Sequence, residues 1–360
     1  MITWLYFFMI IICFVFSVTN KKNNFISIFI SIGTFLLFAG NTFNSDSNLY
    51  LYSFMTGDYD RFEVGYRLFY DFLIKVGVTN YQFTVIIIFL ILSFLIYICI
   101  KKFTHNYMLF LLLLLSSELF IETVQLRTFI SSVLLFAAIT YYPENKMKAI
   151  IFCILSGSFQ MVGVFYIPFF IYSLLKKDRI FENNKIKYQY VILFLIAYLL
   201  LLLLNNFFHI NIILVILKLI AKKIPALEHM TFYFGGTNWG SLPFVLLYLC
   251  NILNLWFINQ NTNKSFLKYK NLILNINIYA ALCLPLLFVD MNFYRIFRIL
   301  NISNFAYFSS VFWSEHKRLT VNYLKKFGII YITQIFWIIN YIIRVPEIFK
   351  DILSNNMWIG

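Results

Sequence analysis

The sequence has little charge for its length. Asp, Glu, Lys and Arg make up only 12% of its 360 residues, whereas 61% are hydrophobic and the mean hydropathy is +0.80. A soluble globular domain carries about 25% charged residues. The composition therefore excludes an ordinary soluble domain and a disordered chain, and it predicts a protein that lies largely within a lipid bilayer.

The sequence also lacks the patterns of common metal, disulfide and nucleotide sites. Its five cysteines all lie inside apolar runs and none has C-x-x-C spacing, so neither a disulfide framework nor a zinc site is indicated. No G-x-x-x-x-G-K-[ST], G-x-S-x-G or H-E-x-x-H motif occurs. ATP hydrolysis and the common hydrolase reactions are thus unsupported, and we expect no metal and no cofactor.

The charge that is present is mostly basic, with a net value of +14. In a soluble protein this excess would indicate nucleic acid, but here 18 of the 29 Lys and Arg residues lie in short loops between apolar runs. Basic short loops mark the cytoplasmic side of a membrane protein. We therefore expect no nucleic-acid partner, and we expect the following loops to be cytoplasmic: 19–24, 101–106, 143–148, 176–187, 260–270 and 313–326.

The apolar runs predict an all-α polytopic bundle in a single membrane domain spanning residues 1–360. A helix needs roughly 20 apolar residues to cross the hydrocarbon core, and we count about 10–12 spans on that basis. The run 149–175 is too long for one span and too short for two, and Ser156-Gly157-Ser158, Gly163 and Pro168 interrupt it. We predict a broken or re-entrant element there. The regular spans are expected near 2–18, 25–40, 83–100, 107–121, 124–142, 188–204, 241–259, 272–289, 295–312 and 327–343.

Two segments between the spans have a different character. Residues 41–82 hold five of the 15 carboxylates and many tyrosines, and such aromatic content argues against disorder. A connection of this length is typically a binding loop, so we predict a folded extracytoplasmic cap. Residues 205–240 are expected to form an extracytoplasmic interfacial segment that begins with an amphipathic helix.

The cap supplies candidate catalytic carboxylates. Asp46 lies at the mouth of a span, and Glu63 lies among aromatic side chains that would shield it and raise its pKa. A sugar hydroxyl that acts as a nucleophile needs such a base within hydrogen-bond reach. Tyr50 and Tyr66 are candidates for stacking on sugar rings. The alternative for each acid is a helix N-cap or a solvated loop charge.

Three arginines lie near the predicted outer ends of spans. Glu122 precedes Arg127 by five residues, so both lie near the same membrane end if helical pitch persists between them. Charges beside spans are typically functional, and we place this pair at the substrate site. Arg295 and Arg298 are spaced to share one helix face, which suits a lipid diphosphate. Asp290 is a possible partner for either. The alternatives are an internal Glu–Arg pair and arginines that reach toward headgroups.

An ordered set of residues resembles one family. The set is Asp46 with Tyr50 and Tyr52; Glu63-Val64-Gly65-Tyr66; Gln125-Leu126-Arg127 opening a span with Ala137-Ala138; the break 156–163 before Tyr166-Ile167-Pro168; and Tyr294-Arg295. It resembles the EpsG family of bacterial exopolysaccharide and capsule proteins, which are regarded as Wzy-like polymerases. The resemblance covers roughly residues 20–310. One departure is Gln160, where the family pattern usually has a His; Gln does not titrate, but it can hydrogen-bond a substrate.

The resemblance implies a glycosyl transfer on the outer face of the bacterial cytoplasmic membrane. Polyprenyl-diphosphate-linked oligosaccharides would be both donor and acceptor, and other polysaccharide-assembly proteins are expected partners. Three other functions stay open: a lipid-linked oligosaccharide flippase, a membrane acyltransferase that decorates the same polymer, and a non-catalytic assembly subunit. The absence of internal repeats weighs against the flippase. His209 and His229 lie outside any span, which weighs against the acyltransferase.

Overall fold

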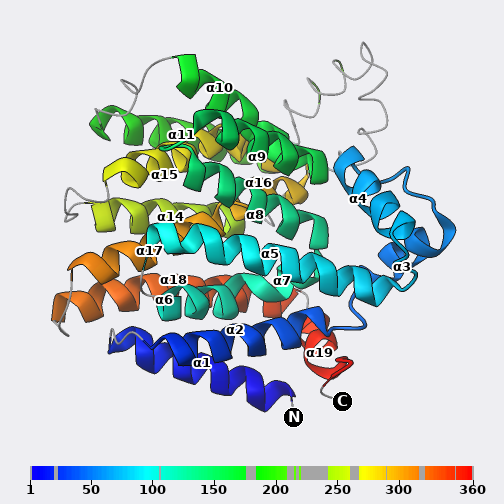
Figure 1. Cartoon of the computed structure of the whole chain (residues 1–360). Coiled ribbons are helices and arrows are strands. Elements are labelled where there is room, and N and C mark those ends of the chain that lie inside the picture. The colour runs from blue at the N-terminus through cyan, green and yellow to red at the C-terminus, as the bar shows by residue number, and fades with distance from the viewer. Residues whose placement is uncertain are drawn as a thin grey trace.

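The computed structural model describes residues 2–19, 23–104, 107–175, 184–208, 242–259, 267–288, 290–315, 321–344 and 346–358, together with Val215 and Leu219. Long helices lie side by side in a bundle, and a pair of shorter helices, α3 and α4, sits at one end of it (Figure 1). We call this pair, with its flanking turns, the cap. In chain order the elements are α1 (Ile2–Val18), α2 (Asn24–Ala39), α3 (Ser47–Thr56), α4 (Val64–Lys75), α5 (Tyr81–Phe103), α6 (Tyr107–Leu113), η1 (Leu114–Glu118), α7 (Leu119–Val124), α8 (Leu126–Tyr141), α9 (Lys146–Phe159), η2 (Met161–Tyr166), α10 (Ile167–Leu175), α11 (Asn184–Phe208), α14 (Leu242–Asn259), α15 (Leu267–Ala280), η7 (Ala281–Phe288), η8 (Met291–Tyr294), α16 (Arg295–Arg298), α17 (Asn301–Glu315), α18 (Val321–Arg344) and α19 (Pro346–Ser354).

The predicted all-α membrane fold is confirmed. Four helical segments are long and apolar enough to cross a membrane, and five shorter apolar helices accompany them in the described part of the chain. The number of helices that cross the bilayer stays a prediction. The four long segments are Tyr81–Phe103, Tyr107–Val124, Gln189–Phe207 and Tyr269–Leu287.

The centre of the bundle is the segment Tyr107–Val124, which is 94% buried. Ionisable residues in a membrane bundle face its interior, and this segment carries Glu118 and Glu122, both buried. Its middle turn, η1, is π-helical, and the hydroxyls of Ser116 and Ser117 there donate to Leu112 O and Leu113 O. π-turns widen a helix locally and often accompany functional sites. Here the turn ends on Glu118, inside the core.

The predicted break in the run 149–175 is confirmed. α9 ends at Phe159, and Gln160 takes an extended conformation with φ −151° and ψ 125°. A 3₁₀ turn, η2, follows before α10 begins at Ile167. Gly157 and Gly163 permit the close approach, because a Cβ on Gly163 would lie 2.7 Å from Gly157 N. At the break between α9 and α10, the chain therefore exposes backbone groups that a straight helix would hide.

The cap docks on this break. A Cβ on Gly65 of α4 would lie 2.3 Å from Ser158 Oγ and 2.8 Å from Ser158 O, so only glycine allows the contact seen. Inside the cap, Tyr66 donates to Tyr70 through a 2.7 Å hydroxyl contact, and both rings are buried. The aromatic content of 41–82 thus builds a small core, which agrees with a folded cap.

The predicted interfacial segment 205–240 lies outside the described residues, apart from 205–208, Val215 and Leu219. His209, His229 and residues 176–183 of the predicted basic loop 176–187 lie outside them as well. α5 begins near the cap and runs away from it along the bundle (Figure 1), and Lys101 and Lys102 lie in its last turn.

Candidate functional site

Two carboxylates begin the two cap helices, yet neither caps its helix. Asp46 and Glu63 occupy the N-cap positions of α3 and α4, and no side-chain cap hydrogen bond forms at either. An N-cap Asp normally accepts from a backbone N–H of the first turn. Both carboxylates are therefore available to other partners, which argues against the capping alternative.

Glu63 joins the cap to the bundle. Its Oε2 lies 2.5 Å from Arg127 Nη1, and its Oε1 accepts from Met161 N at 3.2 Å. Arg127 is in the first turn of α8, and Met161 follows the break after α9. One carboxylate thus ties together three segments that are distant in sequence.

Tyr50 and Phe62 also contact Arg127. Its Nε donates to Tyr50 Oη at 3.4 Å, and its guanidinium lies over the Phe62 ring, 4.8 Å from the centroid. Its side chain is 19% exposed and that of Glu63 is 23% exposed. A guanidinium has five N–H donors in a planar fork, so this arrangement leaves donors for an anionic ligand.

Arg295 adds a second cation beside Asp46. The charges of Arg295 and Arg127 both act on Asp46 and on Tyr50. Burial raises the pKa of the Asp46 carboxyl, and the two arginines offset part of that rise. Arg295 Nε is buried and has no hydrogen-bond partner among the described residues. We call Asp46, Tyr50, Glu63, Arg127 and Arg295 the cap cluster.

Two glutamines near the cap cluster carry buried acceptors. Gln160 is 7% exposed, and its Oε1 has no hydrogen-bond partner in the described part of the chain. The same holds for Oε1 of Gln125, two residues before Arg127. A buried polar atom without a partner is costly and marks a candidate ligand contact. Gln125 was not among the predicted site residues, although it opens the Arg127 helix.

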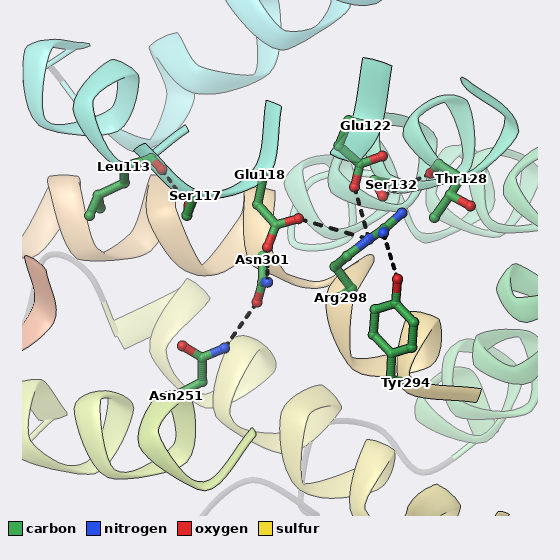
Figure 2. Close-up of polar contacts among 10 residues, drawn as sticks. All are labelled: Leu113, Ser117, Glu118, Glu122, Thr128, Ser132, Asn251, Tyr294, Arg298 and Asn301. Atoms are coloured by element: carbon green, nitrogen blue, oxygen red, sulfur yellow. Dashed lines mark hydrogen bonds and ion pairs between the residues drawn. The ribbon is translucent and has the colours of Figure 1, made fainter. Parts of the chain in front are cut away.

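A second cluster is buried in the bundle, and Figure 2 draws its contacts. Arg298 Nε lies 3.3 Å from Glu122 Oε1 and 3.8 Å from Glu118 Oε2, and Arg298 Nη1 donates to Tyr294 Oη at 3.1 Å. Asn301 Nδ2 donates to Glu118 Oε1. We call these five residues the core cluster. It places two carboxylates around one buried guanidinium.

The core cluster continues into a row of amides. Asn251 Nδ2 donates to Asn301 Oδ1 at 3.0 Å, and Gln334 Nε2 donates to Asn251 Oδ1 at 3.2 Å (Figure 2 draws the first of these). The row joins α14, α17 and α18 to Glu118 at the end of η1. Amides within apolar runs were the signal for this network, because polar side chains at membrane depth need partners.

The structure changes the predicted place of three residues. Glu122 pairs with Arg298 rather than lying beside Arg127, because the helix breaks at Gln125, which has φ −96° and ψ 64°. Arg298 is 1% exposed between two carboxylates, so it lies in the core of the bundle rather than at an outer end of a span. Tyr66 lies in the aromatic core of the cap at 0% exposure rather than on an open surface, and its role stays a prediction.

The remaining predicted residues do gather. Asp46, Glu63, Tyr50, Arg127 and Arg295 form the cap cluster, and their roles stay predictions. Asp290 Oδ1 accepts a hydrogen bond from Asn292 N at 2.6 Å. Asp290 thereby caps the start of η8, which precedes Arg295. Within the described ranges, no group of three His, Cys, Asp or Glu side chains is arranged to hold a metal ion.

Comparison with known proteins places the chain in a family. No curated protein and no solved structure matches it. The family model described as the EpsG family matches residues 25–351, which include the whole cap cluster and the whole core cluster. Since that match covers nearly all of the 360 residues, the chain belongs to the EpsG family.

Proposed function

We propose that this protein is a Wzy-like polymerase that joins polyprenyl-diphosphate-linked oligosaccharide units at the outer face of the bacterial cytoplasmic membrane. The observation that carries the proposal is the cap cluster, in which two arginines and two non-capping carboxylates meet where the cap docks on the bundle. Membership of the EpsG family supports the same reaction.

The reaction needs few chemical groups from the protein. The hydroxyl of the acceptor sugar attacks the anomeric carbon of the donor, a glycosidic bond forms, and the bond from that carbon to the diphosphate oxygen breaks. The electron pair leaves with the polyprenyl diphosphate. Because this leaving group is already good, the protein mainly positions both sugars and stabilises the developing negative charge.

Arg127 and Arg295 are suited to the charge. A guanidinium matches phosphate oxygens through paired N–H donors, and it needs no metal to do so. The charge on the diphosphate increases as the glycosidic bond breaks, so cations fixed beside it lower the barrier more than they strengthen ground-state binding. Glu63, Tyr50 and Phe62 hold Arg127 in one orientation.

Asp46 is the better candidate base of the two carboxylates. Glu63 is committed to Arg127 and to Met161 N, whereas the Asp46 side chain makes no hydrogen bond within the described ranges. Burial raises the pKa of Asp46, which makes its carboxylate a stronger base. In this proposal Asp46 takes the proton of the acceptor hydroxyl, and Glu63 positions Arg127.

The test is the fate of repeat units in a strain that lacks the gene. We expect single repeat units on the outer leaflet and at the cell surface, because assembly and export continue while joining stops. Repeat units trapped on the cytoplasmic leaflet would instead identify a flippase. Polymer of normal length in the deletion strain would overturn the proposal.

A further inference from the structure

A groove of about 810 Å³ runs along the bundle between α2 and α5. Its α2 wall extends from Asn24 to Phe38, and its α5 wall from Phe89 to Lys101. At 1.5 Å per residue the α2 wall is about 21 Å long. That length covers most of a hydrocarbon core of roughly 30 Å. The groove therefore has the dimensions of a site for an extended apolar chain.

The lining of the groove is apolar, and the side chains at its rim are exposed on the surface of the bundle. Phe94 of α5 is 66% exposed, and Ile28 of α2 is 58% exposed, whereas Phe110 on the floor is 2% exposed. The hydroxyls of Ser27 and Ser31 each donate to a carbonyl of their own helix at 2.8 Å. These small side chains thus require no polar ligand, and they leave the groove open.

The groove ends beside the cap cluster. Phe38 lines both the groove and a small neighbouring pocket of about 10 Å³, and Tyr50 lines that pocket from the cap side. Tyr50 is the residue that accepts from Arg127 Nε. Gln82 Nε2 donates to Ala39 O at 2.9 Å, so α5 is attached to the end of α2 at this level. The groove thus leads, through Phe38 and Tyr50, toward Arg127.

We propose that the α2–α5 groove holds the isoprenoid chain of the lipid carrier while Arg127 and Arg295 hold its diphosphate. The inference rests on the proposed function, and it adds the place where the carrier binds. A long apolar chain joined to an anionic head matches a long apolar groove that leads toward Arg127 of the cap cluster. A bilayer phospholipid and a second copy of the chain are the competing occupants.

The test is photocrosslinking on the full-length protein in nanodiscs. The probe is a polyprenyl phosphate with a diazirine in its isoprenoid chain, and cross-linked peptides are mapped by mass spectrometry. Ser31→Trp and Ser93→Trp fill the groove from opposite walls. Phe29→Trp and Ile91→Trp are matched controls, because both residues are exposed on the same helices but do not line the groove.

We expect cross-links on α2 and α5. Labelling should fall about tenfold in the groove-filling variants, since overpacking a site weakens binding by that order. The control variants should label like wild type. Cross-links outside the groove, equal labelling by a diazirine phosphatidylglycerol that competes with the probe, or unchanged labelling in both groove-filling variants would each overturn the proposal.

The two proposals fail separately. Cross-links outside the groove, together with single repeat units on the surface of the deletion strain, would leave the polymerase standing without this lipid site. Cross-links inside the groove, together with normal polymer in the deletion strain, would leave a polyprenyl-binding protein with another function. A dimer interface that covered the groove would exclude the probe, and labelling of α2 and α5 would then be lost.

Discussion

Arg127 and Arg298 each pair with glutamate, but their surroundings differ. Arg127 faces one carboxylate, Glu63, with its side chain 19% exposed at the junction of cap and bundle. The Arg298 side chain has 0% exposure and lies between Glu118 and Glu122 (Figure 2). The comparison shows that two residues of the same type can differ widely in exposure and in the number of carboxylates that surround them.

The two clusters also differ in what holds them. Arg298 lies within an amide network that joins four helices, so its interactions belong to the packing of the bundle. Arg127 connects a docked pair of helices to the bundle through Glu63. Loss of the first should affect the fold, whereas loss of the second should affect the reaction. Arg295 and Arg298 share the short helix α16.

The largest effect is expected from Arg298→Met. Removing one partner from a buried ion pair costs about 3–5 kcal/mol, because the remaining charges stay buried without compensation. Glu118 and Glu122 would be left facing each other, so the variant should accumulate poorly in membranes and unfold at a lower temperature. Immunoblots and thermal unfolding in detergent measure both.

A matched triple variant sharpens this result. Arg298→Met with Glu118→Gln and Glu122→Gln removes the charges together, so it should recover part of the lost abundance. If Arg298→Met alone accumulates like wild type and unfolds at the same temperature, the core cluster is not a structural ion cluster and the comparison fails.

Arg127→Met should have the next largest effect, on the reaction. The loss of one preorganised donor to a developing charge costs about 10²–10³ in rate, and we expect the upper end because Arg127 carries a full charge. Abundance should stay close to wild type, since Arg127 and Glu63 are both partly exposed. The rate of repeat-unit joining in membrane vesicles, normalised to protein, gives the answer. Equal losses of abundance and rate would give Arg127 the same structural role as Arg298.

Asp46→Asn should lower the rate by about 10², because a positioned general base contributes at least that much. The raised pKa of Asp46 gives the pH dependence a definite sign. The base must be ionised, so the wild-type rate should fall as pH decreases through a midpoint above about 3.9, the ordinary value for Asp. In Asp46→Asn this acidic limb should disappear. A variant that keeps the acidic limb would show that another group titrates.

Gly65→Ala should have the smallest effect. Its Cβ would meet Ser158, so α4 must shift away from the end of α9 and move Glu63 relative to Arg127. We expect a partial loss of joining rate at normal abundance. Gly328→Ala is the matched control, since nothing lies within 4 Å of a Cβ there. Equal rates in the two variants would show that cap docking does not set the position of Arg127.

Much of the fold was predictable because apolar runs determine where membrane helices form. The break at Gln160 was predictable as well, since small residues and a proline interrupt an apolar run that is too long for one span and too short for two. Local composition was enough in both cases. It also identified 41–82 as a folded segment, because its tyrosines and phenylalanines build a core.

The pairing of charges was not predictable from local pattern. Glu122 was placed with Arg127 on the assumption of continuous helical pitch, but Gln125 interrupts the helix between them. The actual partner, Arg298, is distant in sequence. The partner of Arg127, Glu63, lies 64 positions away, on the cap. Contacts of this kind depend on how helices pack, which spacing along one helix does not encode.

The central claim is that Arg127 acts on the substrate, and Arg127→Lys tests it most directly. Lysine keeps the charge but loses the planar fork that matches phosphate oxygens. The measurement is polymer length made by purified protein in nanodiscs from a polyprenyl-diphosphate-linked repeat unit, with thermal unfolding recorded on the same samples. We predict that wild type makes a series of polymers of increasing length. Arg127→Lys should make single or very short products at an unchanged unfolding temperature. The wild-type series of polymers from Arg127→Lys would contradict the central claim.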